Sequence, residues 1–279
     1  MAVDLHTHSN ASDGSESPAA VIRNAAGAGL HAVALTDHDN LDGIDEARAA
    51  AADVGVELIP GTELSVEWDS GGMHLLVYFL ESGPGPLQDA MVGIRDGRTD
   101  RNRRLADRLC GLGIDLTYDE VAVEAGGSGI GRPHFASIMV KKGYVPDIPS
   151  AFDRYLAAGR PGYEPRSRLG AEEAVALARA SGGVPVIAHP HTVGVGVDDY
   201  DRAFRKLADV GLGGIECYYS EYGPELRLHL ADVALGLGIA ATGGSDYHGG
   251  YKAGIDIGVG RGDLVVPDRA LEQLFAARG

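Results

Sequence analysis

The chain has 279 residues, of which 44% are hydrophobic and 23% are charged, and its formal net charge at pH 7 is −16. This composition excludes an intrinsically disordered chain, and no apolar run reaches the roughly 18 residues that a membrane helix needs. The negative charge disfavours nonspecific attraction to nucleic acid or acidic membranes, so we expect no membrane partner and no stable binding of duplex nucleic acid.

The N-terminal residues and the cysteines indicate the compartment. No basic stretch followed by an apolar one is present at the start, which predicts a cytoplasmic protein without a secretory signal. Cys110 and Cys217 are far apart in the sequence and lie outside any CxxC motif. This spacing disfavours both a disulfide framework and a thiolate zinc site.

Strand-like and helical segments alternate along most of the chain. Seven segments rich in apolar or β-branched residues predict strands: VDLHTHS, HAVALTDHD, VELIPGTELSV, MHLLVYFL, GVPVIAHP, GIECYY and GIAATGGSD. Segments with helical spacing are SPAAVIRNAAGAG, LGAEEAVALARASG, YDRAFRKLADVG, PELRLHLADVALG and, at the end, PDRALEQLFAARG. This α/β alternation predicts parallel strands covered by helices, either as a barrel or as an open doubly wound sheet.

One long segment interrupts the alternation. Between about Pro84 and Pro165 only helical patterns occur, among them RTDRNRRLADRLCGLG, RPHFASIMVKKG and IPSAFDRYLAAG, and the sequences SGPGP and RPGYEP mark its ends. We therefore expect residues 1–83 and 166–279 to form one discontinuous barrel domain and residues 84–165 to form a helical insertion domain.

Histidine and acidic residues gather at the ends of the predicted strands. His6 and His8 are two residues apart on the first strand and therefore share a face. The other candidates are Asp13, His38, Glu63, His189, Asp246 and His248, while His74 is the exception because it begins the fourth strand. In a β/α barrel the carboxyl ends of the strands meet on one face, so we expect these side chains to form a cluster.

The side-chain types in this cluster indicate its chemistry. Imidazoles and carboxylates without thiolates suit zinc, manganese or iron, and they make a calcium site or a structural cysteine–zinc site a poor explanation. Nine candidate ligands exceed what one ion needs, which predicts two or three divalent metal ions. Neighbouring ions of this kind are suited to the hydrolysis of phosphate esters.

These motifs resemble those of the PHP (polymerase and histidinol phosphatase) family of phosphoesterases. The matching stretches, in order, are DLHTHSNASDGS, ALTDHDNLDGIDEA, PGTELS, HLLVYF, GRPHFA, AFDRYLAAGRPGYEP, VIAHP and TGGSDYHG. The resemblance implies a distorted (β/α)7 barrel and a three-metal centre. One metal would be held by His6, His8, Glu63 and Asp246, a second by Asp13, His38 and His248, and a third by Glu63, His74 and His189.

The insertion with its GRPH motif resembles one subgroup of this family. That subgroup includes phosphatases that remove the 3'-phosphate of nucleoside 3',5'-bisphosphates, relatives that trim short RNA from the 5' end, and relatives acting on AMP. The resemblance implies hydrolysis of a phosphate monoester on a small nucleotide or short oligoribonucleotide by a metal-bridged hydroxide. A histidinol-phosphate or sugar-phosphate phosphatase is the alternative within the family.

Further residues are candidates for contacts with the substrate. Arg132 and His134 offer donors for a second phosphate, and Arg166 lies where the chain re-enters the barrel. Asp37 is expected to orient a metal ligand or to protonate the leaving group, and His191 to support a ligand or to meet the leaving group. The basic run Arg95, Arg98, Arg101, Arg103, Arg104 and Arg108 favours a solvated helix face over a substrate contact.

Two alternative functions do not involve the hydrolysis of phosphate esters. An amidohydrolase also begins with an HxH strand, but many such enzymes use a carboxylated lysine on a strand. Here Lys141, Lys142, Lys206 and Lys252 all lie outside the predicted strands. A noncatalytic PHP module would be expected to have lost metal ligands, whereas this chain retains every one of them.

Overall fold

The computed structural model describes residues 2–69, 71–126, 130–165 and 168–279. In these residues one sheet of eight strands is formed by β1 (Ala2–Thr7), β2 (Leu30–Leu35), β3 (Glu57–Trp68), β4 (Gly71–Tyr78), β5 (Leu169–Gly170), β6 (Val184–Ala188), β7 (Gly214–Tyr219) and β8 (Ala240–Gly244). The strand order is β1-β2-β3-β4-β6-β7-β8, and β5 pairs with β3. All seven predicted strands are present. The additional strand β5 has two residues, which is too short for periodicity to reveal.

The sheet curls until its two ends nearly meet. Asp246, just after β8, donates its backbone N–H to the His6 carbonyl at 2.9 Å, and His8 donates to the Tyr247 carbonyl at 2.8 Å. Gly244 allows this close approach, because a Cβ at that position would collide with His6. The predicted α/β barrel is therefore confirmed.

The strands are not all parallel, and on this point the sequence-based expectation was wrong. β3 and β4 form an antiparallel hairpin in which Trp68 pairs with Gly71 and Ser65 pairs with His74, and β4 is also antiparallel to β6. Parallel neighbours need a long crossover connection, and too few residues separate β3 from β4 to provide one. As a result, the first residues of β4 lie at the edge of the sheet where the other strands end.

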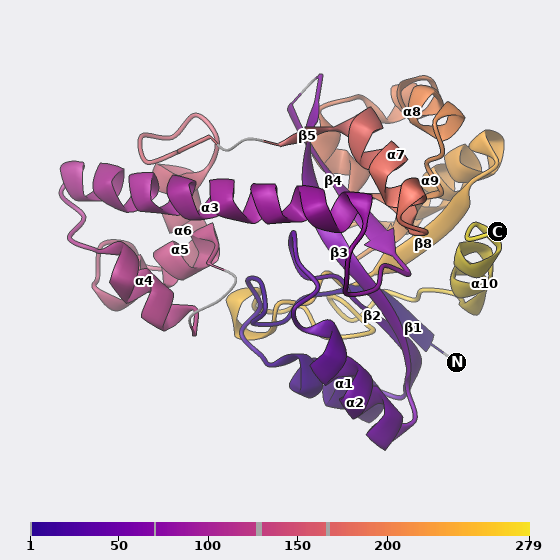
Figure 1. Cartoon of the computed structure of the whole chain (residues 1–279), viewed down its shortest axis with the longest axis horizontal. Coiled ribbons are helices and arrows are strands. Elements are labelled where there is room, and N and C mark those ends of the chain that lie inside the picture. The colour runs from indigo at the N-terminus through magenta and orange to yellow at the C-terminus, as the bar shows by residue number, and fades with distance from the viewer. Residues whose placement is uncertain (1, 70, 127–129, 166–167) are drawn as a thin grey trace.

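Helices cover the outside of the barrel (Figure 1). They are α1 (Pro18–Gly27), α2 (Ile44–Val54), α7 (Ala171–Ala180), α8 (Tyr200–Asp209), α9 (Pro224–Leu237) and α10 (Asp268–Ala276). Ser17 caps α1 by accepting the Ala20 N–H, and Pro18 occupies the first turn, as the sequence pattern predicts. Helix α2 was not predicted. None of the helices in the described ranges has the length and apolar character to cross a bilayer.

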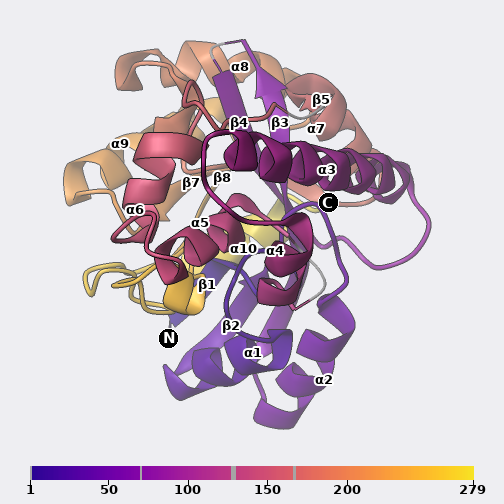
Figure 2. The ribbon, with the colours of Figure 1, turned by 90° about the vertical axis from the view of Figure 1, so that its left-hand side faces the viewer.

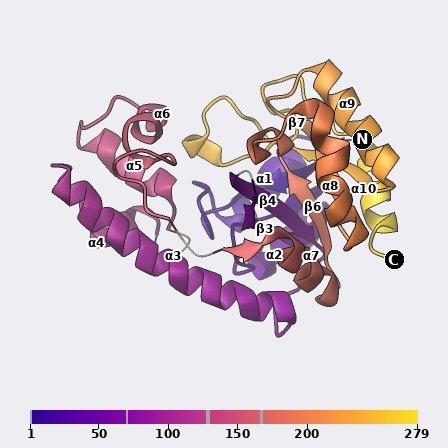
Figure 3. The ribbon, with the colours of Figure 1, turned by 90° about the horizontal axis from the view of Figure 1, so that it is seen from above.

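The insertion contains α3 (Pro86–Gly111), α4 (Tyr118–Glu124), α5 (Arg132–Lys141) and α6 (Ile148–Ala151), followed by a π-helical turn over Phe152–Leu156. Figures 1 and 3 show α3 running from the barrel to the group of α4, α5 and α6, and Figure 2 shows these helices in front of the strands. The sequence pattern predicted α3 only from residue 98. Leu87 and Met91, in its first turns, pack in the barrel core, whereas Leu105 and Leu109 pack in a second core within the insertion. One helix therefore joins both cores.

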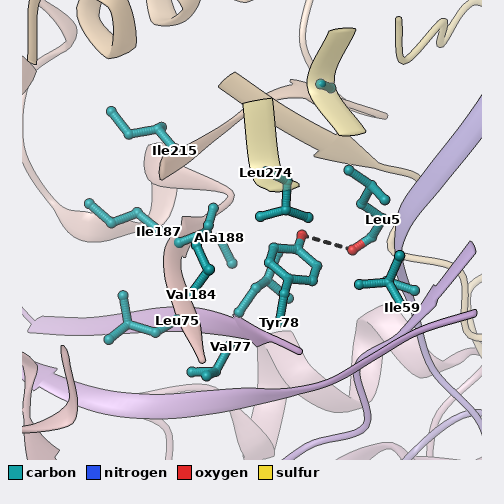
Figure 4. Packing of buried hydrophobic residues seen from close by; sticks show 14 of the residues in the cluster. Leu5, Ile59, Leu75, Val77, Tyr78, Val184, Ile187, Ala188, Ile215 and Leu274 are labelled. Carbon is teal, nitrogen blue, oxygen red and sulfur yellow. Dashed lines mark hydrogen bonds between the residues drawn. The ribbon is translucent and has the colours of Figure 1, made fainter. Parts of the chain in front are cut away.

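The barrel core contains a buried tyrosine with a defined hydrogen bond. Tyr78 is fully buried on β4, and its hydroxyl donates to the Leu5 carbonyl at 2.8 Å (Figure 4). Leu75, Ile187 and Ile215 belong to the same hydrophobic core. The bond joins two strands that are distant in the sequence, so it ties β4 to β1 inside the barrel.

Replacing Tyr78 by Phe removes this donor and keeps the ring. We expect Tyr78→Phe to lower the free energy of unfolding by about 1–2 kcal/mol, because a buried carbonyl loses its partner. Urea denaturation of the metal-free protein measures this change. The control is Tyr144→Phe, whose hydroxyl accepts an exposed N–H from Asp115 at 2.9 Å. Equal stabilities of the two variants would contradict the role assigned to Tyr78.

Candidate metal centre

The structure brings all nine predicted ligands together at one edge of the barrel. Strands β1 and β3 carry His6 and Glu63, and the segments after β1, β2, β6 and β8 carry His8, Asp13, His38, His189, Asp246 and His248. His74 joins them because β4 runs antiparallel and begins at this edge. The antiparallel direction of β4 therefore explains why His74, which lies near the start of its strand and not at the end, is part of the cluster.

Backbone conformation helps to aim several of these side chains. The segment around His38 continues beside β3, with the Asp39 N–H donating to the Glu63 carbonyl at 3.1 Å. His189 and Asp246 have φ angles of 28° and 57°, in the left-handed region that non-glycine residues rarely adopt. Such strained residues concentrate at functional sites, where the surrounding structure holds them in place.

Glu63 lies at the centre of the cluster. Its Oε2 is 3.3 Å from His6 Nε2, 3.1 Å from His8 Nε2 and 3.3 Å from His38 Nδ1. Its Oε1 is 2.7 Å from His74 Nδ1 and 3.0 Å from His189 Nε2. The two oxygens of one buried carboxylate therefore face five imidazoles, divided into two sets.

Asp246 and Asp13 complete two further groups around the histidines. Asp246 Oδ1 is 3.6 Å from His6 Nε2 and 3.5 Å from His8 Nε2. Asp13 lies 3.3 Å from His248 Nε2 and 3.6 Å from His38 Nε2. His8 lies between the two groups, since its other nitrogen, Nδ1, is 3.7 Å from Asp13.

The spacing of these atoms fits bound cations. Ligand atoms about 2.0–2.2 Å from one ion lie roughly 3.0–3.5 Å from each other, and His6 Nε2 lies 3.0 Å from His8 Nε2. The buried Nδ1 of His8 has no hydrogen-bond partner. Burying the facing Nε2 atoms of His6 and His8 costs free energy unless a proton or a metal ion lies between them, and burying the unpartnered Nδ1 of His8 costs free energy unless it too has a partner. The residues therefore fit divalent metal ions.

The charges of the cluster show the same need for cations. Burial lowers the pKa of His6 and His248, but nearby carboxylates outweigh it, raising the pKa of His6 well above its usual value and that of His248 to about 9. For His38, burial dominates and lowers the pKa to about 4. Burial raises the pKa of Glu63, but the surrounding histidines hold it well below its usual range. Without metal, protons on some imidazoles balance the carboxylates.

Glu216 supports the cluster from behind and was not predicted. It is fully buried on β7, with Oε1 2.9 Å from His6 Nδ1, and its Oε2 accepts the His189 backbone N–H at 2.7 Å. A carboxylate in this position fixes the ring so that Nε2 faces the centre. The signal in the sequence was a single glutamate within the otherwise apolar strand GIECYY. Tyr219 and Lys252, which contact Asp246, were not predicted either.

Asp37 lies behind the site. One of its oxygens accepts the Ser9 N–H at 2.8 Å and the Ser12 hydroxyl at 2.6 Å, and the other accepts the Ser9 hydroxyl at 2.7 Å. These bonds hold the loop that carries Asp13. These contacts give Asp37 a role in shaping this loop, and among the contacts of the described residues its carboxylate reaches no ligand imidazole.

His191 lies at the rim of the cluster. Its Nδ1 is 2.9 Å from the Tyr222 hydroxyl, and its side chain is 39% exposed. Its ring centroid lies 6.1 Å from that of His189. Burial, and then the neighbouring His189, lower its pKa.

A pocket of about 180 Å³ opens between the cluster and the insertion. Asp13, His38 and His74 line one side of it. The other side is lined by Arg98, Arg101, Arg132, Arg168, Phe152 and Tyr163, among others. Guanidinium groups thus face the candidate metal ligands across a space that is open to solvent.

The basic run of α3 does not form one solvated face as expected. Arg98 and Arg101 turn toward the pocket, and Arg98 pairs with the buried Asp39 at 2.6 Å. The others lie elsewhere: Arg95 pairs with Asp42, Arg104 and Arg108 pair with Glu164, and Arg103 lies over the ring of Tyr118. Two of the six arginines therefore line the pocket and four do not, and the charge pattern of the sequence could not distinguish them.

The residues predicted to contact the substrate differ in their position relative to the pocket. Arg132 lines the pocket, and its guanidinium donates to the Leu156 carbonyl at 3.1 Å. His134 is 1% exposed and accepts the Gly131 N–H at 3.0 Å, so it caps α5 and is not among the residues that line the pocket. Arg166 lies outside the described residues, but Arg168, close by in the sequence, lines the pocket.

Comparisons with known proteins agree with this geometry. A family model described as the PHP domain matches residues 4–109. The chain is similar to a 3',5'-nucleoside bisphosphate phosphatase of Chromobacterium violaceum, with 34% identity covering 92% of this chain and 90% of that protein. A 5'-3' exoribonuclease of Haemophilus influenzae is 32% identical, covering 88% of this chain and 89% of that protein. A solved structure from Bifidobacterium adolescentis, described as a metal-dependent phosphoesterase, matches with a TM-score of 0.86 at 29% identity and covers 99% of this chain and 96% of that one.

Metal loading should release protons. The carboxylates around His248 raise its pKa to about 9, so this group carries a proton near pH 7.5 in the metal-free protein, and the raised pKa values of His6 and His189 act in the same direction. We expect calorimetric titration with Mn²⁺ at pH 7.5 to show a heat that depends on the ionisation enthalpy of the buffer. The release should be smaller at pH 9.5, above the pKa of His248. A heat that is independent of the buffer at pH 7.5 would contradict this protonation pattern.

Proposed function

Because this chain belongs to the PHP family of metal-dependent phosphoesterases, we propose that it hydrolyses phosphate monoesters of small nucleotides. The preferred reaction is removal of the 3'-phosphate of a nucleoside 3',5'-bisphosphate, with AMP and the 5' end of short RNA as related substrates. The observation that carries the proposal is the pocket in which metal ligands face four arginines. The names of the bisphosphate phosphatase and exoribonuclease relatives support the same substrate class.

The proposed cofactor is a set of two or three divalent ions, manganese, zinc or iron. His6, His8, Glu63 and Asp246 would hold one ion, Asp13, His38 and His248 a second, and Glu63, His74 and His189 a third. The distances around Glu63 and Asp13 support this division, and the position of His8 Nδ1 near Asp13 places that ring beside the second group as well. Such ions lower the pKa of water and neutralise phosphoryl oxygens.

The arginines of the pocket provide the positive charge that an anionic substrate needs in order to bind this acidic chain. A protein with a net charge of −16 repels an anionic substrate unless positive charge is concentrated where the substrate binds. Arg132, with Arg101 and Arg168, supplies that charge beside His38 and His74, while the charge of Arg98 is balanced by its ion pair with Asp39. Guanidinium groups bind phosphate through paired hydrogen bonds, so these residues would hold the second phosphate while the first lies at the metal centre.

The remaining residues of the pocket would bind the rest of the nucleotide. Phe152 and Tyr163 line the pocket beside Arg132, whose guanidinium carbon lies 5.7 Å and 5.9 Å from the two ring centroids. These rings offer an apolar surface for the nucleoside. His191, partly exposed and held by Tyr222, is our candidate for the group that gives a proton to the leaving oxygen.

The lysines of the chain argue against amidohydrolase chemistry. Lys141, Lys142 and Lys206 form ion pairs with Glu124, Glu120 and Glu172. Lys252 contacts the Asp246 oxygen that faces away from the histidines. Among the described residues, no lysine on a strand is available to become a carboxylated metal bridge.

Substrate preference tests the proposal. A phosphate-release screen should favour nucleoside 3',5'-bisphosphates over histidinol phosphate and sugar phosphates. We expect Arg132→Ala to lower kcat/KM for adenosine 3',5'-bisphosphate by about 10- to 100-fold, the value of one or two charged hydrogen bonds, and that for 4-nitrophenyl phosphate by much less.

The matched control is Arg202→Ala, which breaks an exposed ion pair with Asp199 on the outside of the barrel. It should leave both rates unchanged. Equal losses on the two substrates in Arg132→Ala would rule out a contact between Arg132 and the second phosphate.

A further inference from the structure

We propose that Lys252 is a positioning residue that, together with Tyr219, restricts Asp246 to metal ligation through one oxygen. This inference rests on the ligand set of the proposed function and is independent of which nucleotide is the substrate. It concerns the part of the centre formed by the end of β7 and the loop after β8, which contributes no residue to the lining of the arginine pocket.

The two oxygens of Asp246 face different partners. Oδ2 lies 2.5 Å from Lys252 Nζ and accepts the Tyr219 hydroxyl at 2.8 Å. Lys252 also donates to the Tyr219 hydroxyl oxygen at 3.2 Å, which closes a triangle of hydrogen bonds. Oδ1 lies 3.3–3.6 Å from nitrogens of His6, His8 and His248. Only Oδ1 is therefore directed at the metal centre.

Lys252 does not occupy the position of an ion. Among the contacts of the described residues, its ammonium reaches no imidazole nitrogen and no carboxylate other than Asp246. It approaches from the outer side of Asp246, and its side chain is 29% exposed. An ammonium that replaced a metal ion would lie among the histidines and Glu63.

The part of the loop that precedes Lys252 is anchored to β1 and to the segment after it. The Asp246 backbone N–H donates to His6, and the Gly250 N–H donates to the Ser15 hydroxyl at 2.7 Å. The Ser15 N–H in turn donates to the His248 carbonyl at 3.1 Å. The ammonium is thus held at a set place relative to Asp246, as expected for a residue that orients a ligand.

Fixing one oxygen has a definite consequence for the metal. A carboxylate whose two oxygens are both free can rotate and bind one ion through both, which changes the number of ligands around it. Hydrogen bonds to the second oxygen prevent this, and loss of such supporting contacts typically weakens metal affinity by about 10- to 100-fold. The charge of Lys252 also balances that of Asp246 in a buried place.

The test is Co²⁺ titration of metal-free protein followed by visible absorption and equilibrium dialysis. We expect Lys252→Met to weaken the binding of one ion by about 10- to 100-fold and to change the absorption of the bound Co²⁺. Lys252→Arg should restore most of the affinity, and Tyr219→Phe should cause a smaller loss. The control is Lys206→Met, which removes a lysine paired with Glu172 on the surface.

Unchanged affinity and absorption in Lys252→Met would overturn the proposal. Thermal unfolding of the metal-free variants checks folding, and Tyr219→Phe, which removes only a hydroxyl, keeps the test decisive if Lys252→Met fails to fold. Because metal titration needs no turnover, it remains informative if the nucleotide substrate proves wrong.

Kinetics separate positioning from contact with substrate. For a positioning residue, kcat of Lys252→Met should recover as metal is raised to saturation, with KM close to that of the wild type. A raised KM that persists at saturating metal would instead assign Lys252 to the substrate and overturn the proposal.

Discussion

The architecture of the site depends on one buried carboxylate shared among five imidazoles. Glu63 has nearly no contact with solvent, and its two oxygens face histidines from β1, β2 and β6 or their ends, as well as from β4, the hairpin partner of β3. Burying such a charge costs several kcal/mol unless cations compensate it. The curled sheet, the left-handed φ angles of His189 and Asp246, and the contact of Glu216 with His6 each help to bring a nitrogen or oxygen toward this site.

Strand direction decides which residues can meet Glu63. In a barrel of only parallel strands, His74 would lie toward the far edge, about 13 Å away, which is the length of the four residues from His74 to Tyr78. The antiparallel β3–β4 hairpin brings the start of β4 to the edge where the other strands end. The departure from a regular β/α barrel is thus what places His74 on the side of Glu63 Oε1, next to the pocket that opens toward the insertion.

Much of this could be predicted from the sequence, since apolar runs marked seven strands and motif spacing marked all nine clustered residues. The rest depends on tertiary contacts. Gly93 and Gly97 weaken the helical pattern of early α3, and packing of Leu87 and Met91 on the barrel restores the helix. Arg98 and Arg101 could not be separated from their neighbours by charge alone. Asp37 resembled a partner of His38, but its oxygens turn to Ser9 and Ser12.

The most direct test of a shared carboxylate is the number of ions bound by Glu63→Gln. After chelation, reloading with Mn²⁺ and gel filtration, elemental analysis should find two or three ions per chain in the wild type. We expect at most one in Glu63→Gln, held by the group around Asp13. The control is Glu57→Gln, exposed at the start of the same strand, which should retain the wild-type number. An unchanged ion count in Glu63→Gln would contradict the central place given to this carboxylate.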